Sequence, residues 1–349
     1  MKINMIMPGV NHSGGVQMAW QYLNYFTTNG ADVICYSPMK SLVKTGLNSD
    51  SLGRWFPRNF KLKFIPVVND FTIRNADITI ATSWITSYWV SSLSSKKGKK
   101  VYFIQDYETW FSNDKNARVR GSYHLPMDLR ISVSTMLQQK LQKIDDCDSL
   151  VICNGIPKSF IKEKSIIQKS RNNSIVVGMP YREKKGNIDI KNCNFGIRVV
   201  KKLQKKNPNL KFQMYGFKRP KNLDKNIFFL ENPSRNELIK WYDSVDILYI
   251  PSLYEGWGLP AMEGMARGCA VISSDTGCIK EFGKNKVNCI KLKNMVDEVQ
   301  ATNALQTLID QNDTRNRIGT AALMTVKDYT FEKFANLFLS ELDRLNREY

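Results

Sequence analysis

Short apolar runs alternate with amphipathic stretches along most of the chain, an order that is typical of parallel α/β proteins. In the first half, the pattern predicts strands at 2–8, 31–37, 61–67, 76–82, 100–106 and 149–155. It predicts helices at about 16–29, from Trp84 onward, and at about 134–144. Residues 107–126 follow no period, and so long a segment is more typical of a functional loop than of a connector. The first half is therefore expected to form a Rossmann-like domain.

The same order restarts after a polar, lysine-rich stretch that ends near residue 173. The pattern then predicts strands at 174–180, 211–216, 227–232, 245–250 and 270–274, helices at about 194–206 and 235–243, and an amphipathic helix at 331–346. A chain of 349 residues exceeds the usual size of a single hydrophobic core. We therefore expect an N-terminal domain at 1–157, a linker at 158–173, a second domain at 174–330 and a C-terminal helix at 331–349.

The run from Pro251 to Gly277 places two carboxylates, Glu255 and Glu263, eight positions apart across a predicted strand-to-helix turn. Pro260 stands where the helix is expected to begin, and Gly268 is its expected end. Glu255 is then on a loop at the carboxyl end of a strand, and the Cβ of Glu263 tilts back toward that loop. Both carboxylates can accept hydrogen bonds from the hydroxyls of one ligand, while the glycine backbone and the helix N-terminus favour a diphosphate.

Two glutamates on a glycine-containing turn would, by themselves, be interpreted as solvated side chains. Here they lie within P-S-x-x-E-G-W-G-L-P-x-x-E-x-x-A-x-G, which closely resembles the donor-site signature of family 4 glycosyltransferases of GT-B fold. The resemblance implies two Rossmann-like domains that face each other across a cleft, with the C-terminal helix crossing back to the first domain. It also implies that Glu255 binds hydroxyls of the donor sugar and that Glu263 binds the ribose hydroxyls of a nucleotide diphosphate.

Two further loops match the family's pattern. Relatives hold the donor diphosphate with an arginine and a following lysine-glycine pair, which YREKKG supplies as Arg182 and Lys185-Gly186. The tighter spacing leaves Lys184 as an alternative to Lys185, although two loop cations facing a diphosphate make physical sense in either case. Gly14-Gly15 matches the loop after the first strand. The donor-binding residues that the resemblance implies are Gly14, Gly15, Arg182, Lys185, Glu255, Gly256, Trp257, Gly258, Leu259 and Glu263.

One departure from the family lies in the segment FIQDYETWF. Many relatives carry a histidine followed by an aspartate there, whereas this chain has Gln105 and Asp106. An amide does not titrate, so Gln105 cannot be a general base, and Asp106 is either the proton-handling candidate or a cap of the following turn. The string VYFIQDYE itself resembles a subgroup that includes bacterial rhamnosyltransferases building surface polysaccharides.

The resemblance implies a retaining hexosyltransferase in which the leaving diphosphate takes the proton of the acceptor, so that no enzymic nucleophile is required. Arg182 and Lys185 would stabilise the departing diphosphate, and neither a metal nor another cofactor is expected. With Glu255 and Asp106 they form the expected catalytic set. The string Asp146-Cys147-Asp148 has the spacing of a metal site, but it precedes a predicted strand, so we expect a solvated loop there.

The net charge is +19, and the densest basic stretches are KKGKK from Lys96 to Lys100, KKLQKK from Lys201 to Lys206, and the segment from Arg54 to Phe64. Such a charge attracts nucleic acid, anionic lipid or phosphorylated substrates, or it belongs to an ordinary lysine-rich surface. Aromatic residues that alternate with cations, as from Arg54 to Phe64, are typical of a lipid interface, although this segment could equally lead into a strand.

Seven cysteines are scattered without a C-x-x-C pair, which fits a reducing compartment. No apolar run has the length needed to span a bilayer, and residues 1–8 fit a first strand better than a signal peptide. We therefore expect a cytoplasmic enzyme, peripheral at the inner face of the cytoplasmic membrane, that glycosylates a lipid-linked or nascent surface glycan. The donor sugar, the base, the linkage and the oligomeric state do not follow from the sequence.

Two other classes of protein stay open at this point. A sugar-nucleotide epimerase or an inverting GT-B enzyme could share the double Rossmann architecture, but each would be expected to carry titratable groups in its cleft, and the only histidines are His12 and His124. A basic nucleic-acid-binding protein without catalysis would match the charge. However, no helix-turn-helix, zinc-finger or RNP motif appears in the sequence.

Overall fold

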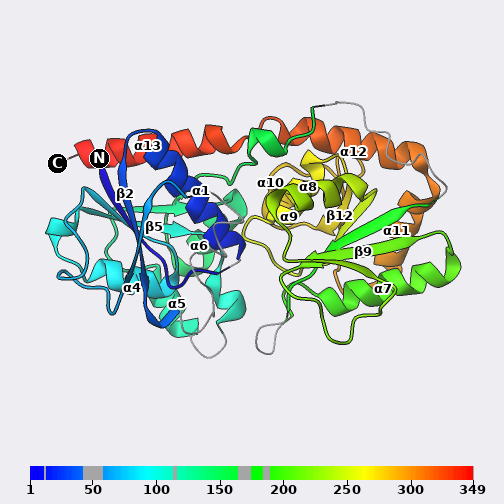
Figure 1. Cartoon of the computed structure of the whole chain (residues 1–349), viewed down its shortest axis with the longest axis horizontal. Helices are drawn as coiled ribbons and strands as arrows, with labels where there is room; N and C mark the ends of the chain where they lie inside the picture. The colour runs from blue at the N-terminus through cyan, green and yellow to red at the C-terminus, as the bar shows by residue number, and fades with distance from the viewer. Residues whose placement is uncertain (12, 42–57, 113–115, 164–173, 184–188, 349) are drawn as a thin grey trace. The chain divides into compact units, whose positions relative to one another are not determined.

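The computed structural model describes residues 1–11, 13–41, 58–112, 116–163, 174–183 and 189–348 (Figure 1). They form two compact units, the first made of Met1–Gly155 with Phe331–Tyr349 and the second of Ile156–Thr330. The described part of the expected linker, residues 158–163, belongs to the second unit. The C-terminal helix belongs to the first unit, so the chain crosses back to its starting unit as the resemblance implies.

The described residues of the first unit contain a seven-stranded parallel sheet in the order β3-β2-β1-β4-β5-β6-β7. Its strands are β1 (Lys2–Ile6), β2 (Asp32–Pro38), β3 (Lys61–Ile65), β4 (Ile78–Ala81), β5 (Lys99–Ile104), β6 (Leu129–Ser132) and β7 (Leu150–Val151). Its α-helices are α1 (Gly14–Thr28), α4 (Trp84–Ser91), α5 (Asn116–Ser122), α6 (Thr135–Asp145) and α13 (Phe331–Arg347). Helices cover both faces, with α1 and α13 on one side and α4 and α5 on the other (Figure 1). Strands in such a sheet are buried on both faces, which explains their near-continuous apolar runs.

Helix α13 joins the first unit through the apolar face that its sequence period predicts. The ring of Phe338 is fully buried, with centroid distances of 5.0 Å to Tyr22, 5.4 Å to Phe26 and 5.2 Å to Phe103. About two helical turns before Phe338, Phe331 also contacts Tyr22 at 5.3 Å. Burial of each such ring contributes about 1.5–3 kcal/mol. The aromatic cluster therefore fixes α13 against α1 and β5.

The described residues of the second unit contain a six-stranded parallel sheet in the order β10-β9-β8-β11-β12-β13. Its strands are β8 (Val176–Pro180), β9 (Lys211–Gly216), β10 (Phe228–Glu231), β11 (Ile247–Ile250), β12 (Ala270–Ser274) and β13 (Ile290–Leu292). Its helices are α7 (Cys193–Lys206), α8 (Arg235–Ser244), α9 (Leu259–Ala266), α10 (Gly277–Phe282), α11 (Glu298–Asp310) and α12 (Asn312–Val326). Helices α7 and α11 pack together, as do α9 and α12. This is a second Rossmann-like unit, as the pattern predicts.

The sequence pattern is wrong about one segment and incomplete elsewhere. Residues 107–126 are not irregular throughout, because they contain a 3-10 turn, η2 (Glu108–Phe111), and helix α5. Strand β6 is not predicted, because only two of its four residues are buried and Arg130 interrupts its apolar run. The pattern also does not predict α10, β13, α11 and α12, which complete the second unit after the signature strand.

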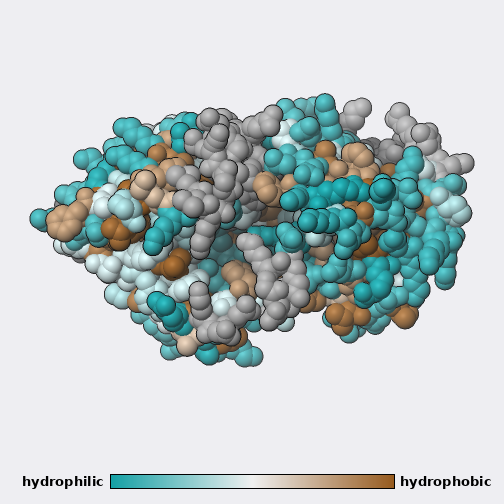
Figure 2. All heavy atoms as spheres, turned by 60° about the horizontal axis from the view of Figure 1, so that its bottom comes forward, coloured by the Kyte–Doolittle hydropathy of each residue, from teal (hydrophilic) through white to brown (hydrophobic). Residues whose placement is uncertain are grey.

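The surface carries exposed cations and isolated apolar side chains. No helix in the described part of the chain combines the length and the apolar content needed to cross a membrane. On the face shown in Figure 2, hydrophobic residues form small separate patches among hydrophilic ones. Among the described residues, Phe71 is 98% exposed and Val67 is 52% exposed, both in the loop after the edge strand β3. Lys61 and Lys63 of that strand are exposed as well.

The KKGKK run is not a uniform surface patch, contrary to the expectation of a basic cluster there. Lys97 is only 5% exposed, and its Nζ donates to the carbonyl oxygen of Ile73 at 2.7 Å and to Asn75 Oδ1 at 2.9 Å. A buried ammonium needs such acceptors to offset its lost hydration. Lys97 therefore fastens the loop before β4 and adds no charge to the surface.

A connecting segment, residues 156–163, carries the chain into the second unit. The N–H of Ile156 donates to the carbonyl oxygen of Tyr329 at 2.9 Å, and Ile156 forms a parallel bridge with Thr330. The first and the last residues of the second unit, Ile156 and Thr330, are therefore side by side.

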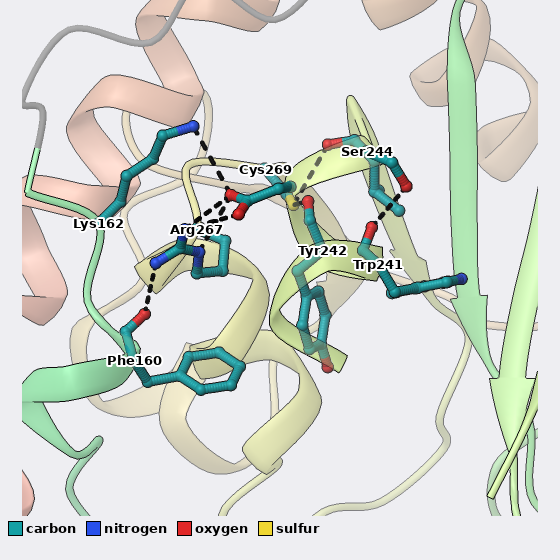
Figure 3. Close-up of polar contacts among 9 residues, drawn as sticks. Phe160, Lys162, Trp241, Tyr242, Ser244, Arg267 and Cys269 are labelled. Atoms are coloured by element: carbon teal, nitrogen blue, oxygen red, sulfur yellow. Dashed lines mark hydrogen bonds and ion pairs between the residues drawn. The ribbon is translucent and has the colours of Figure 1, made fainter. Parts of the chain in front are cut away.

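The side chains of the second unit hold this connecting segment in place. Arg267 donates to the carbonyl oxygen of Phe160 at 3.1 Å and to both carboxylate oxygens of Asp243 (Figure 3). Lys162 lies 3.6 Å from Asp243 Oδ1 and donates its backbone N–H to the carbonyl oxygen of Ala266 at 2.9 Å. The bidentate arginine–carboxylate pair gives the anchor a defined geometry.

Candidate nucleotide-sugar site

The sheet of the second unit changes direction between β8 and β11. From β8 the chain moves outward to β9 and β10, and then it returns to the other side of β8 at β11. In such sheets, ligands bind beyond the carboxyl ends of the strands at this switch point. The segment between β8 and α7 meets the segment between β11 and α9 there, because the N–H of Leu253 donates to the carbonyl oxygen of Ile190 at 2.8 Å. Arg182 follows β8 and Glu255 follows β11, so both lie at the switch point.

Glu255 is buried and has a cation as its partner. Its Oε2 lies 2.6 Å from Nζ of Lys191, which stands directly before α7. The side chain of Glu255 keeps 10% of its surface exposed, and that of Lys191 keeps 28%. Because a buried carboxylate is costly without a partner, Lys191 is part of what keeps Glu255 at this site. The sequence analysis missed Lys191, which is 64 positions away from Glu255 along the chain.

Glu263 lies in α9 and is almost fully buried, with 5% of its side chain exposed. Arg235 Nη1 donates to its Oε1 at 2.8 Å, and the hydroxyl of Tyr242 donates to its Oε2 at 3.0 Å. Both partners come from α8, which the signature motif does not include. Burial, and then the charges of Glu263 and Glu255, raise the pKa of Tyr215. The charges of both glutamates therefore reach Tyr215, and their binding of one common ligand stays a prediction.

The loop between the two glutamates has a tightly fixed backbone. Gly258, the N-cap of α9, has a φ of 85°, a conformation that residues with a Cβ rarely adopt. Trp257 is 3% exposed, its Nε1 lies 3.3 Å from Met262 Sδ, and its carbonyl oxygen accepts from the N–H of Cys278. Its indole thus anchors the loop from the inside. Gly256 is buried, and Leu259 is half-buried at the first position of α9.

The predicted diphosphate cations are only partly visible. Arg182 is exposed and lies two positions beyond the carboxyl end of β8. Lys184, Lys185 and Gly186 lie outside the described residues, so their predicted role stays a prediction. The structure describes the chain again from residue 189 onward, and this part contains Lys191, which pairs with Glu255. The loop after β8 and the signature loop are therefore neighbours on both sides of the switch point.

In the first unit, Gly14 and Gly15 open α1, whose N-cap is Ser13. A Cβ on Gly15 would lie 3.4 Å from Gln105 Nε2, so the loop after β5 packs against the start of α1. Asp106 follows in a bend and is half-buried. The structure thus brings together the glycine pair and the Gln105-Asp106 position, which are the sites predicted from the first half of the sequence.

Glu108, a half-buried acid that was not predicted as a site residue, lies two positions further on. Glu108 Oε1 accepts from the N–H of Trp84 at 2.6 Å and from the hydroxyl of Tyr102 at 3.2 Å. Burial and, to a smaller extent, the charge of Asp106 raise the pKa of Glu108 to about 8. Glu108 is thus mostly protonated at neutral pH. Its place in the QDYE string could have drawn attention to it, but its hydrogen bond to the first residue of α4 could not be inferred from the string.

The D-x-D string forms the expected loop. Asp146 ends α6 in the left-handed conformation, with a φ of 46°, and both it and Asp148 are exposed, whereas Cys147 is buried. The outer two side chains therefore face solvent between a helix and a strand, as predicted.

Residues 165–324, a range that contains both Glu255 and Glu263, match the family model described as glycosyl transferases group 1. This match lies within the second unit and covers less than half of the chain. The fold of the whole chain is similar to that of Anabaena HepE, solved in complex with UDP and glucose, with a TM-score of 0.77 at 15% identity over 99% of this chain and 100% of that one. It is also similar to WaaG, described as a glycosyltransferase involved in lipopolysaccharide biosynthesis, with a TM-score of 0.71 at 12% identity over 97% of this chain and 99% of that one. These likenesses show the GT-B fold.

Curated relatives match over shorter stretches. The MMP alpha-(1->4)-mannosyltransferase of Mycolicibacterium hassiacum is 35% identical over 86 residues, which are 25% of this chain and 21% of that protein. The chain spans between 16% and 26% of the length of the curated relatives that it matches. The comparisons therefore show the fold of the whole chain, a match of the second unit to the glycosyl transferases group 1 model, and partial likeness to relatives that are named as glycosyltransferases.

Proposed function

We propose that this protein is a retaining glycosyltransferase that moves a hexose from a nucleotide-diphosphate donor to a glycan or lipid-linked acceptor. The proposal rests on one observation above all. Glu255 and Glu263 flank the start of α9 at the switch point of a sheet that matches the glycosyl transferases group 1 model. The UDP and glucose bound to HepE, which shares the fold, support a nucleotide sugar as the class of donor.

Each group at the site then has a task. Glu263 accepts hydrogen bonds from the ribose hydroxyls, and Glu255 accepts them from the hydroxyls of the donor sugar. Arg182 and Lys185, with the N-terminal end of α9, stabilise the charge of the diphosphate as its bond to the sugar breaks. The acceptor oxygen bonds to the anomeric carbon on the same face, and its proton passes to the departing diphosphate. Fixed cations take the place that a metal has in other transferases.

The acceptor side of the proposal rests on the first unit and on charge. Docking on an anionic membrane surface is supported by the net charge of +19, by the exposed Lys61 and Lys63 of β3, and by Phe71, which is 98% exposed in the loop after that strand. The likeness in fold to WaaG and the resemblance of VYFIQDYE to surface-polysaccharide enzymes support a lipid-linked or nascent surface glycan as acceptor. We therefore place the enzyme at the inner face of the cytoplasmic membrane.

A panel of nucleotide sugars tests the donor. We expect one UDP-, GDP-, dTDP- or ADP-sugar to raise the melting temperature and to be hydrolysed slowly, since a ligand that binds the folded state stabilises it. NMR of the first product should show the anomeric configuration of the donor preserved. If no nucleotide sugar stabilises the protein or is consumed, the proposed function is wrong. An inverted product would reject the retaining mechanism and require a catalytic base.

A further inference from the structure

We propose that Arg235 is a positioning residue for Glu263, and that Phe160 of the connecting segment holds Arg235 in place. The inference rests on the proposed function, because the ligand concerned is the ribose of a nucleotide diphosphate. Arg235 is 28 positions from Glu263 and lies outside the signature motif. Its role is therefore visible only in the folded second unit.

The hydrogen bonds from the protein occupy only half of the acceptor positions on the carboxylate of Glu263. A carboxylate offers about four lone-pair positions, two on each oxygen. Among the described residues, Arg235 donates to Oε1 at 2.8 Å and Tyr242 donates to Oε2 at 3.0 Å. One position then remains on each oxygen. Two adjacent acceptors match a vicinal diol such as the 2′- and 3′-hydroxyls of ribose, provided that the carboxylate keeps this orientation.

The tyrosine side of the carboxylate is fixed by a chain of hydroxyls. The hydroxyls of Tyr215 and Tyr242 are 2.8 Å apart, and a hydroxyl has one proton to donate. The hydroxyl of Tyr242 lies 3.0 Å from Glu263 Oε2 and 3.4 Å from the carbonyl oxygen of Pro260, so the shorter bond to the charged acceptor takes its proton, and Tyr215 then donates to Tyr242. Burial raises the pKa of both tyrosines, so both keep their protons at neutral pH. The hydrogen bond from Tyr242 to Glu263 therefore persists without Arg235. Of these two hydrogen bonds to Glu263, replacing Arg235 then removes only the one to Oε1.

Arg235 is held by an aromatic face. It is the first residue of α8, after the N-cap Ser234, and its Cζ lies 4.0 Å from the centroid of the Phe160 ring. Phe160 is fully buried, and its ring also contacts Tyr242 at 5.9 Å. A planar guanidinium can stack on a ring and still direct its edge at a carboxylate, which a lysine ammonium cannot reproduce. The ring of Phe160 thus sets the plane from which Arg235 reaches Glu263.

A second arginine provides a matched control. The side chain of Arg267 contacts the same Phe160, but through the backbone carbonyl oxygen at 3.1 Å, and the other hydrogen bonds of this side chain go to Asp243 (Figure 3). The side chain of Arg267 therefore anchors the connecting segment without bonding the carboxylate of Glu263. Loss of Arg267 should loosen the segment, whereas loss of Arg235 should misplace the ribose acceptor.

The test compares each nucleotide with a form that lacks the diol. UDP, GDP and ADP are titrated calorimetrically into the full-length protein, and the tightest binder is then compared with its 2′,3′-dideoxy counterpart. For the wild type, we expect the dideoxy form to bind about 10- to 100-fold more weakly, the usual effect of losing hydrogen bonds to a charged acceptor. The same pair of nucleotides is measured with Arg235→Gln, Phe160→Leu, Arg267→Gln and Glu263→Gln.

We expect Arg235→Gln and Glu263→Gln to reduce the ratio of the two dissociation constants to less than about threefold, with Phe160→Leu between them and the wild type. Arg267→Gln should keep the wild-type ratio. A general loss of folding weakens both nucleotides equally and leaves the ratio unchanged, so a wild-type ratio in Arg235→Gln overturns the inference. Binding of no nucleotide diphosphate by the wild type would instead overturn the proposed function together with the inference.

Discussion

Gly277 fixes the loop between the two glutamates, and replacing it with alanine should disturb the donor site. Its φ is 54°, in the left-handed region, and a Cβ there would lie 2.2 Å from the carbonyl oxygen of Trp257. The same Cβ would lie 3.1 Å from the Cβ of Glu255. The nearest atoms are the backbone of Trp257 and the Cβ of Glu255. Neither is the end of a flexible side chain that could move aside. The loop itself must shift.

Two separate costs follow from this geometry. A residue with a Cβ in the left-handed region costs roughly 1–2 kcal/mol. Gly30 isolates this cost, because its φ is 86° and nothing lies within 4 Å of an added Cβ. Gly277→Ala carries the same cost, and in addition Trp257 must move by about 1 Å to restore van der Waals contact. A displacement of about 1 Å at a positioning group can cost about 100-fold in rate.

Chemical denaturation and nucleotide titration of both variants separate the two effects. We expect Gly30→Ala to lose roughly 1–2 kcal/mol of stability, and Gly277→Ala to lose more, because the backbone of Trp257 must also shift. Nucleotide affinity and turnover should fall by about 10- to 100-fold in Gly277→Ala and stay within about twofold in Gly30→Ala. Wild-type affinity and turnover in Gly277→Ala would refute the claim that this contact positions the donor loop.

Three further predictions concern charge. Arg182→Ala should lower sugar transfer by orders of magnitude while excess chelator leaves the wild type active, and complete loss with EDTA that manganese restores would refute fixed-cation stabilisation. Because the folded-state pKa of Glu108 is raised from about 4.5 to about 8, its stabilising effect is complete below pH 4.5 and is lost as the pH rises to 8. The melting temperature of the wild type should therefore fall across this window relative to Glu108→Gln, and parallel curves would contradict the raised pKa. Anionic liposomes should co-sediment the protein at low salt, and Phe71→Ser with Lys61→Glu and Lys63→Glu should abolish this, whereas unchanged sedimentation would remove that surface from the membrane proposal.

The sequence predicts most strands of both units and the place of the two glutamates at a strand-to-helix turn, because these depend on local signals. Buried parallel strands are apolar along their length, and a glycine-rich turn with a proline marks the start of α9. Both signals can be recognised without knowing the tertiary contacts. Strand β6 lacks the first signal, since half of its residues, including Arg130, are only partly buried.

The partners of the glutamates could not be predicted, because they come from distant parts of the chain. Lys191 and Arg235 look like ordinary surface cations in the sequence, and Tyr242 looks like a core residue of an amphipathic helix. Only the packing of α7 and α8 beside the signature loop brings them to Glu255 and Glu263. The opposite error occurs at Lys97, which reads as a surface charge and is buried.

The most direct test of the donor site is sugar transfer by the two signature variants, measured with the nucleotide sugar that the wild type uses. Glu263→Ala should weaken donor binding by about 1.5–3 kcal/mol, the effect of lost hydrogen bonds to a charged acceptor. Glu255→Gln should lower turnover more than it lowers nucleotide affinity. If both variants instead transfer sugar at wild-type rates with wild-type affinity, these two carboxylates do not form the donor site.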